Sequence, residues 1–233
     1  MTKEMIVMVG TVGQGVMRST DAGETWRRVG IGQGIHSDAL VRVLANHQGQ
    51  PNTIFAGTDR GLLRSADAGA TWQSVDSPLN DYCVWAIAID PVDPKTMFAG
   101  TGTPDPATIF RSTDGGTTWD QRPVEVAEEC PAVGVPRVTG IAIDPDNRRS
   151  IWVGLEVDGV RHSSDGGDTW TAINGAIPNP DVHNVAVAAG PPKTVIVVVN
   201  NDVYTSTDDG STWDRSEERR VGGGGRSRGS PYR

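Results

Sequence analysis

The sequence predicts an all-β fold made of repeated four-stranded antiparallel blades, a β-propeller. Three observations lead to this prediction. The pattern Ser-x-Asp-x-Gly-x-Thr-Trp occurs five times without a mismatch at its fixed positions. Successive tryptophans of the pattern are 46, 47, 51 and 43 residues apart, which is the length of one propeller blade. The 233 residues also include 29 glycines and 15 prolines, as a chain of many short strands and tight turns requires.

Each repeat contains four short runs that predict strands a, b, c and d, named from the propeller axis outward. The runs for strand a are residues 41–45, 84–89, 138–143 and 185–189, and those for strand b include 54–58, 97–101 and 151–155. Within strand a, a mostly small column alternates with large aliphatic residues. We expect this column to line a narrow central channel; it consists of Leu44, Ala88, Ala142 and Ala186.

The eight-residue pattern itself is typical of the tight hairpin between strands c and d. Its Asp can accept backbone N–H bonds across the turn, its Ser can bond the same turn, and its Gly can adopt a positive φ. Thr and Trp are then expected to begin strand d, with the indole buried between blades. We therefore interpret these residues as structural and not catalytic: Asp21, Asp67, Asp114, Asp165, Asp208, Trp26, Trp72, Trp119, Trp170 and Trp213.

The repeat resembles the Asp-box, or bacterial neuraminidase repeat (BNR), of a known propeller family. The resemblance extends from about Met5 to Trp213. The family includes sialidases, xyloglucan-acting glycoside hydrolases, sortilin-type receptor domains and photosystem II assembly factors. The resemblance implies the fold but no particular chemistry, because enzymes and non-enzymes share the motif. It also implies that a ligand would bind on the rim opposite the Asp boxes, as in the related sialidases and glycosidases.

We expect one propeller domain over residues 1–214, with blades at about 5–29, 39–76, 84–124, 138–173 and 183–214. The Arg/Gly-rich tail, 215–233, is expected to be disordered or non-native. The first repeat opens on a strand b, and no alternating apolar segment follows Trp213 to supply its strand a. Two explanations stay open: a five-bladed ring closed by another segment, or five blades of a longer, seven-bladed ring. Unpaired blade edges would favour self-association.

The composition excludes several classes of function. The net charge is −8, and the last nineteen residues contain six arginines and two glutamates, so the rest of the chain is more acidic still. Such a surface repels phosphate backbones, which argues against nucleic acid and favours cationic or neutral ligands. No apolar run approaches the roughly 20 residues that span a bilayer. The N-terminus lacks the features of a signal peptide, so a cytoplasmic location is expected.

The two cysteines, Cys83 and Cys130, are too few for a disulfide framework, and no metal-ligand spacing surrounds them. Whether they form a disulfide stays open. His36 and His183 could join Glu156 or Asp158 around a metal, but their spacing follows no zinc pattern. No phosphate-binding loop or dinucleotide fingerprint occurs. We therefore predict neither a metal nor a cofactor.

The d-to-a and b-to-c connections form the rim opposite the Asp boxes, where binding groups are expected to gather. Many polar and aromatic residues fall in these connections. The ligand-binding candidates are His36, Asp38, Asp59, Arg60, Tyr82, Trp85, Glu129, Arg137, Glu156, Asp158, His183 and Asn201. Aromatic faces beside carboxylates suit sugar rings, and two carboxyl groups about 5 to 9.5 Å apart can form a glycosidase pair. The carboxylate pool for such a pair is Asp38, Asp81, Glu128, Glu129, Glu156 and Asp158.

These observations favour a non-catalytic recognition or assembly scaffold that binds a protein segment or a glycan at this rim. A module of a larger assembly is a related hypothesis that differs only in the partner. The alternative is a glycoside hydrolase, sialidase-like or xyloglucanase-like, that uses paired rim carboxylates. A sialidase resembling its family would need an Arg-Ile-Pro-like segment before the first box, where only Arg18 occurs. A xyloglucanase-like enzyme would have a much longer, two-propeller chain.

Overall fold

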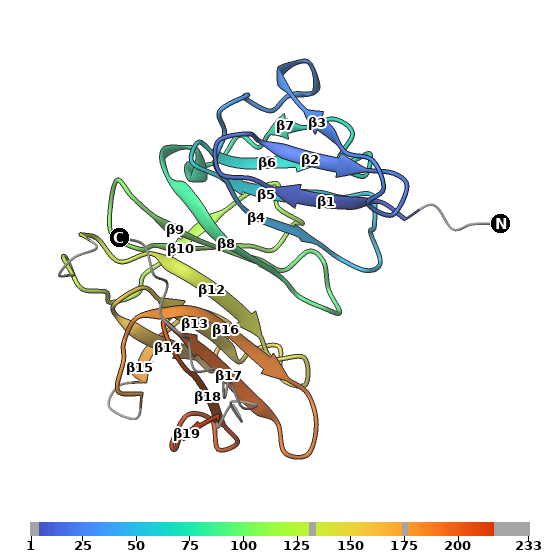
Figure 1. The fold of residues 1–233 in the computed structure, drawn as a ribbon. Helices are drawn as coiled ribbons and strands as arrows, with labels where there is room; N and C mark the ends of the chain where they lie inside the picture. The colour runs from blue at the N-terminus through green and yellow to red at the C-terminus, as the bar shows by residue number, and fades with distance from the viewer. Residues whose placement is uncertain (1–4, 131–133, 174–176, 217–233) are drawn as a thin grey trace, which may run out of the picture.

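The computed structural model describes residues 5–130, 134–173 and 177–216. It consists of five antiparallel sheets that follow one another in chain order along an arc (Figure 1). The first sheet contains β1 (Val7–Gly10), β2 (Val16–Ser19) and β3 (Arg27–Val29). The second contains β4 (Val41–Asn46), β5 (Ile54–Thr58), β6 (Gly61–Ser65) and β7 (Gln73–Ser74). The third contains β8 (Cys83–Ile89), β9 (Met97–Gly102), β10 (Ile109–Ser112) and β11 (Asp120–Arg122).

The fourth sheet contains β12 (Val138–Ile143), β13 (Ile151–Leu155), β14 (Gly159–Ser163) and β15 (Thr171–Ile173). The fifth contains β16 (Val182–Ala188), β17 (Thr194–Val199), β18 (Val203–Ser206) and β19 (Asp214–Arg215). Two short 3-10 helices, η1 (Ile31–Gln33) and η2 (Pro78–Asp81), follow the first and second sheets. Every sheet pairs its strands in chain order, which confirms the predicted all-β, blade-based fold. The described residues include no helix that is long and apolar enough to cross a membrane.

The first sheet has three strands where the other sheets have four, as its opening on a strand b predicts. In the remaining sheets strand a is β4, β8, β12 or β16, and each of these packs along the next one (Figure 1). The first and fifth sheets therefore stand at opposite ends of the arc (Figure 1).

The hydrophobic core is divided among the spaces between neighbouring sheets. One cluster joins Phe98 and Ile109 of the third sheet to Ile151 and Val153 of the fourth, and similar clusters join the other neighbours. Ala88 packs into this cluster between two sheets. The prediction that its column of small residues lines a central channel is therefore wrong. The sheets stand face to face around the arc, and both faces of β8 and β12 therefore meet neighbouring blades.

The pairing of strand a with strand b also shows that one residue of the predicted column was wrong. The residues opposite the large strand-b side chains are alanines in all four sheets, in the pairs Ala45–Phe55, Ala88–Phe98, Ala142–Trp152 and Ala186–Ile196. Ala45, and not Leu44, therefore belongs with Ala88, Ala142 and Ala186. The small residue leaves room on that face of the sheet for the large side chain beside it.

All five Asp boxes form the same network of hydrogen bonds. The Ser hydroxyl donates to the Asp Oδ1 at 2.6 to 2.9 Å, and the Thr backbone N–H donates to the same oxygen at 2.8 to 2.9 Å. The Thr hydroxyl donates to Oδ2 at 2.5 to 2.7 Å. These bonds favour the ionised carboxylate, and the donors on Thr71 and Ser65 lower the pKa of Asp67 to about 2.

The tryptophans of the boxes lie just before strand d and not within it, because β7 and β11 begin one residue later. The indole N–H of Trp72 instead closes the turn by donating to Gly69 O at 3.1 Å. Trp72 and Trp119 are 3% and 5% exposed, as expected for an indole between blades. Trp26 is 39% exposed because the first sheet has no neighbour on that side in the described part of the chain.

The box glycines are sites of close packing between sheets. A Cβ at Gly116 would lie 2.8 Å from Cε1 of Phe55, a strand-b residue of the preceding sheet, and Gly116 also has φ +84°. The same contact recurs in the pairs Met8–Gly69, Phe98–Gly167 and Trp152–Gly210. Gly23, the box glycine of the first sheet, has only its own Trp26 nearby, at 3.6 Å. Each large strand-b side chain therefore fits under the box of the next sheet.

A second close contact joins each strand b to the next strand a. The pairs are Gly10–Val41, Gly57–Val84, Gly100–Val138 and Gly154–Val182, and in each a glycine leaves room for a valine side chain. In β17 the equivalent position is Val198, since Val198 pairs with Asn184 as Gly154 pairs with Gly140. The fifth sheet thus differs from the other four at this position.

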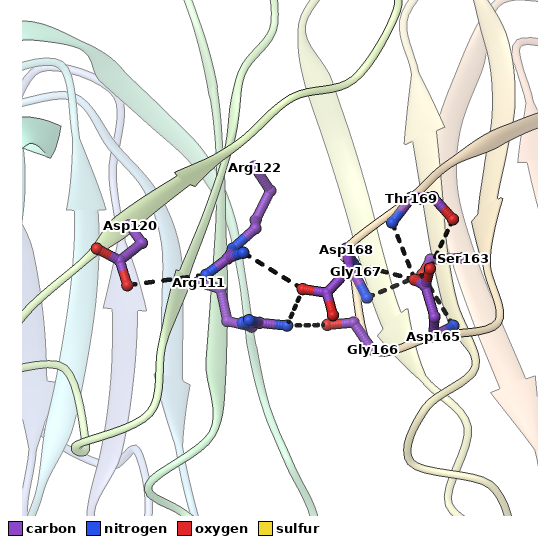
Figure 2. A network of polar contacts seen from close by, with 9 residues as sticks. All are labelled: Arg111, Asp120, Arg122, Ser163, Asp165, Gly166, Gly167, Asp168 and Thr169. Atoms are coloured by element: carbon purple, nitrogen blue, oxygen red, sulfur yellow. Dashed lines mark hydrogen bonds and ion pairs between the residues drawn. The ribbon is translucent and has the colours of Figure 1, made fainter.

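Polar contacts add to the packing between the third and fourth sheets (Figure 2). Arg111 of β10 donates to Gly166 O at 2.7 Å and forms an ion pair with Asp168 at 2.9 Å. Arg122 of β11 lies 3.3 Å from the same Asp168 carboxylate. Because Gly166 and Asp168 belong to the Asp box of the fourth sheet, these arginines hold that box against the third sheet.

Candidate functional site

The two rims of the arc have different contents. On one rim, the boxes of the second, third and fourth sheets lie against the a-to-b turns of their own sheets, for example through Ala68 N donating to Asn52 O at 2.9 Å. On the other rim, the b-to-c turn meets the segment before strand a, where Asp59 N donates to Leu40 O at 3.2 Å. This second rim carries the predicted ligand-binding residues.

Each strand a is irregular where it begins at this second rim. The register shifts at one residue in all four sheets, and the extra residues are Arg42, Trp85, Thr139 and His183. Such a bulge bends the strand and redirects a side chain. Thr139 uses its hydroxyl within the fold, donating to Val182 O at 2.6 Å. Arg42 and Trp85 contact each other across neighbouring sheets.

Two arginines stack on the indole of Trp85. The guanidinium carbon of Arg42 lies 4.2 Å from the ring centroid and that of Arg137 lies 4.7 Å from it. Arg42 belongs to the second sheet, Trp85 to the third, and Arg137 directly precedes β12 of the fourth. We call Arg42, Trp85 and Arg137 the arginine–tryptophan cluster. Stacking of this kind is favourable because the indole face attracts cations.

The two arginines differ in their charge partners. Arg137 forms an ion pair with Glu156, and the side chains of the two residues are 24% and 18% exposed. Arg42 has no carboxylate partner among the residues that the structure describes. Its Nε and the indole Nε1 of Trp85 are buried atoms that lack a hydrogen-bond partner in the same described ranges. Since Arg42 as a whole is half-buried, the cluster offers its cation to an acceptor.

Cys83 lies beside this cluster. Burial raises the pKa of its thiol, and the neighbouring Arg42 offsets only part of this effect. Burial also raises the pKa of the Cys130 thiol. Both cysteines are free, which answers the open question of a disulfide. A thiol of raised pKa is largely protonated at neutral pH, and this form is a poor nucleophile.

The candidate carboxylates are not brought together as one group. Asp38 accepts two bonds of 2.9 Å from the Arg60 guanidinium, which lowers its pKa to about 2. Asp158 accepts from Arg161 Nη2 at 2.7 Å, and Glu156 is paired with Arg137. The other members of the pool are exposed: Asp81, Glu128 and Glu129. Three of the six carboxylates are thus each held by an arginine.

The remaining predicted residues are placed as follows. Tyr82 packs against Phe110, with ring centroids 5.7 Å apart, and so contributes to the core. Asp59 accepts from Leu40 N at 2.9 Å. His183 Nε2 lies 3.5 Å from Asp181, and the side chains of His36 and Asn201 are exposed. Within 5–130, 134–173 and 177–216, no group of three or more His, Cys, Asp or Glu side chains could hold a metal ion.

The sequence predicts Trp85 and Arg137 on the rim opposite the Asp boxes, where the structure has them, but it does not single out Arg42. No local pattern marks Arg42, because its partners lie in two other sheets. The signal that could have found it is the repeat itself. Aligned on their strand-b partners, Arg42 and Trp85 occupy the same bulge position.

The repeated sheets and their Asp boxes define a protein of the β-propeller class. The family model described as photosynthesis system II assembly factor YCF48 matches residues 71–229, and the chain belongs to this family. Curated relatives include xyloglucanase Xgh74A of Acetivibrio thermocellus, 33% identical over 111 residues, covering 44% of this chain and 13% of the enzyme. A xyloglucanase of Hypocrea jecorina is 28% identical over 191 residues, covering 73% of this chain and 22% of the enzyme. The chain thus spans less than a quarter of either relative.

Solved structures that share the fold include the following two examples. The structure of an ancestral GH74 enzyme superposes with a TM-score of 0.74 at 20% identity, covering 90% of this chain and 29% of the enzyme. The structure of YCF48 bound to D1 peptide superposes with a TM-score of 0.63 at 18% identity, covering 91% of this chain and 63% of YCF48. At these identities the similarity concerns the fold alone.

Proposed function

We propose that this protein is a non-catalytic recognition scaffold that binds an acidic segment of another protein at the arginine–tryptophan cluster. The observation that carries the proposal is the stacking of Arg42 and Arg137 on Trp85, with Arg42 lacking a carboxylate partner in the described residues. A carboxylate could accept charge-assisted bonds from Arg42 while an apolar group packs near the indole. An anionic ligand suits this cluster although the protein as a whole is acidic, because rim carboxylates such as Asp38 and Asp158 are already paired with arginines.

The comparisons support a protein segment as the ligand. The matching family is described as an assembly factor, and one similar structure contains a bound peptide. A scaffold also needs no proton donor or nucleophile, which agrees with the pairing of three candidate carboxylates. A glycan, which could stack on Trp85, is the competing ligand for this surface.

The alternative is a glycoside hydrolase, which the similarity to xyloglucanases favours. Such an enzyme needs one carboxylic acid whose pKa is raised so that it can protonate the leaving group. Asp38 has the opposite shift, because the bonds from Arg60 stabilise its ionised form. This observation makes hydrolysis the second candidate.

The proposal predicts that peptides rich in Asp and Glu bind to the whole protein. We expect Arg42→Gln to weaken binding by about tenfold, since charge-assisted bonds contribute about 1.5 to 3 kcal/mol. Arg64→Gln is a matched control, because Arg64 is an exposed arginine on strand c of the second sheet. Binding is measured by calorimetry at two salt concentrations. Equal affinities of the two variants, or equal binding of peptides in which Asn and Gln replace the acids, would contradict the proposal.

A separate assay addresses the alternative. The protein is incubated with xyloglucan and with aryl glycosides, and the release of reducing sugar or phenol is followed. Glu156→Gln and Asp158→Asn serve as variants of the candidate carboxylates. Turnover that either substitution abolishes would establish a hydrolase and overturn the scaffold proposal.

A further inference from the structure

Glu156 holds a carboxylate of the protein itself against the arginine–tryptophan cluster. It forms an ion pair with Arg137, whose guanidinium stacks on Trp85. The backbones of the two paired residues are also bonded, because Glu156 N donates to Arg137 O at 2.9 Å. Arg42 stacks on the same indole but has no carboxylate partner among the residues that the structure describes. The cluster thus contains one cation whose charge is compensated and one cation that is open to a ligand.

The b-to-c turn that carries Glu156 is fixed at its other end. Asp158, two residues later, accepts from Arg161 Nη2 at 2.7 Å and from Ala127 N at 3.0 Å. The side chain of Arg161 is 8% exposed, so this anchor is buried. Between the two carboxylates Val157 has φ +62°, which a β-branched residue adopts only where the surrounding structure imposes it. The backbone therefore keeps Glu156 in its place.

The two cations lie close enough for one short segment to reach both. Their guanidinium carbons are 4.2 and 4.7 Å from the same ring centroid and hence at most about 9 Å apart, whereas alternate side chains on one face of an extended peptide are about 7 Å apart. Two acids at alternate positions could therefore span Arg42 and Arg137 if both arginines were open. Glu156 opposes this, because a second ligand carboxylate must either displace it or lie beside a like charge.

We propose that Glu156 sets the specificity of the arginine–tryptophan cluster by competing with the ligand for Arg137, so that the cluster recognises one carboxylate and not a pair. This inference rests on the proposed function and refines it, since the ligand becomes a segment with a single essential acid. The charge-assisted bond to Arg42 supplies the affinity. A second acid two residues away adds little, because the charge of Arg137 is already compensated by Glu156.

The test compares the binding of two peptides with blocked termini to the full chain, by calorimetry. The diacid peptide is LSDSDSG, and the monoacid peptide is LSDSNSG, in which an amide replaces the second acid. In the unsubstituted protein we expect the two affinities to agree within about threefold, because only one acid at a time can pair with Arg42. In Glu156→Gln, which frees Arg137, the diacid should bind about tenfold more tightly than the monoacid, because a charge-assisted bond is about twice as strong as a neutral one.

Glu24→Gln is the matched control, since it removes the same charge from an exposed residue of the first Asp box, on the opposite rim. It should leave the ratio of the two affinities unchanged. The proposal would be overturned by a preference for the diacid of about tenfold in the unsubstituted protein. No preference in Glu156→Gln, or the same preference in Glu24→Gln, would also overturn it. The comparison in the unsubstituted protein decides the question even if thermal unfolding shows that Glu156→Gln fails to fold.

Failure of the proposed function would give a different result. If neither peptide binds at millimolar concentration, or if Arg42→Gln binds both as tightly as the unsubstituted protein, the cluster is not the binding site and both proposals are overturned. If Arg42→Gln weakens binding but Glu156→Gln leaves the ratio of affinities unchanged, only the role of Glu156 is overturned.

Discussion

At the scale of single residues, the aspartates of the boxes are structural anchors whose partners are at most four residues away. Asp67 receives donors from Ser65 and Thr71, and the other four boxes repeat the arrangement. Both carboxylate oxygens are occupied within the turn. This explains why the motif recurs without change in every sheet.

These bonds predict a dependence of stability on acid. Because the pKa of Asp67 is lowered from 3.8 to about 2 in the fold, the unfolded chain binds its proton first as the pH falls. Stability from this group is therefore complete above about pH 4 and is lost between about pH 4 and 2. We expect denaturant unfolding of Asp67→Asn to show a smaller loss of stability across this window than the unsubstituted protein. An identical pH profile in both proteins would show that the bonds do not stabilise the ionised form.

The sequence predicts the boxes well but the candidate site only in part, for a reason of distance along the chain. The bonds within a box are local, so the residue types at fixed spacing reveal them. Arg42, Trp85 and Arg137 are 43 and 52 residues apart and meet only because three sheets converge at one rim. No local pattern therefore marks their contact, and only an alignment of the repeats places Arg42 and Trp85 at equivalent positions.

At the scale of the elements, neighbouring sheets are joined by large strand-b side chains that fit under glycines. Met8, Phe55, Phe98 and Trp152 each lie under the box glycine of the following sheet. The positions of the strands themselves follow from the sequence, since residues 54–58 and 151–155 form strands as predicted. The column is predicted one residue out, at Leu44, because the bulges that align the four strands are not visible in the sequence; Ala45, like Ala88 and the other alanines, lies three residues after its bulge.

The glycine contacts predict a difference between two otherwise similar substitutions. Gly116→Ala and Gly23→Ala both place a Cβ at positive φ, +84° and +95°. Only the first also meets a ring, that of Phe55 at 2.8 Å. We expect Gly23→Ala to cost about 1 to 2 kcal/mol of unfolding free energy from backbone strain, and Gly116→Ala about 1 to 3 kcal/mol more from overpacking. Denaturant titration of both variants measures the difference, and equal losses would show that Phe55 moves aside freely.

At the scale of the whole molecule, the arc has two ends that differ from its middle. The third sheet is packed on both faces, whereas the first has a neighbour on one face only within the described ranges and lacks a strand a. Val9 and Trp26 of the first sheet region are accordingly 45% and 39% exposed. Packing that is shared between neighbours thus becomes weaker toward the ends.

This arrangement predicts a gradient of local stability. We expect the amides of β1 and β2 to exchange hydrogen on the order of tenfold or more faster than those of β9 and β10, because they need only local opening. Hydrogen exchange followed by mass spectrometry of peptides from each sheet would measure this. Uniform exchange in all five sheets would instead mean that the arc opens as one cooperative unit.

Val198 has a consequence for how copies of this protein meet in concentrated solution. A row of like units can grow into a fibre when its last face accepts the first face of another molecule. Between neighbouring sheets, a glycine of strand b leaves room for a valine side chain of the next strand a. In β17 this position is occupied by Val198, whose side chain fills that space. An incoming strand that repeats the valine contact would collide with a branched side chain. The contact that joins the other sheets therefore cannot be repeated unchanged at the fifth sheet.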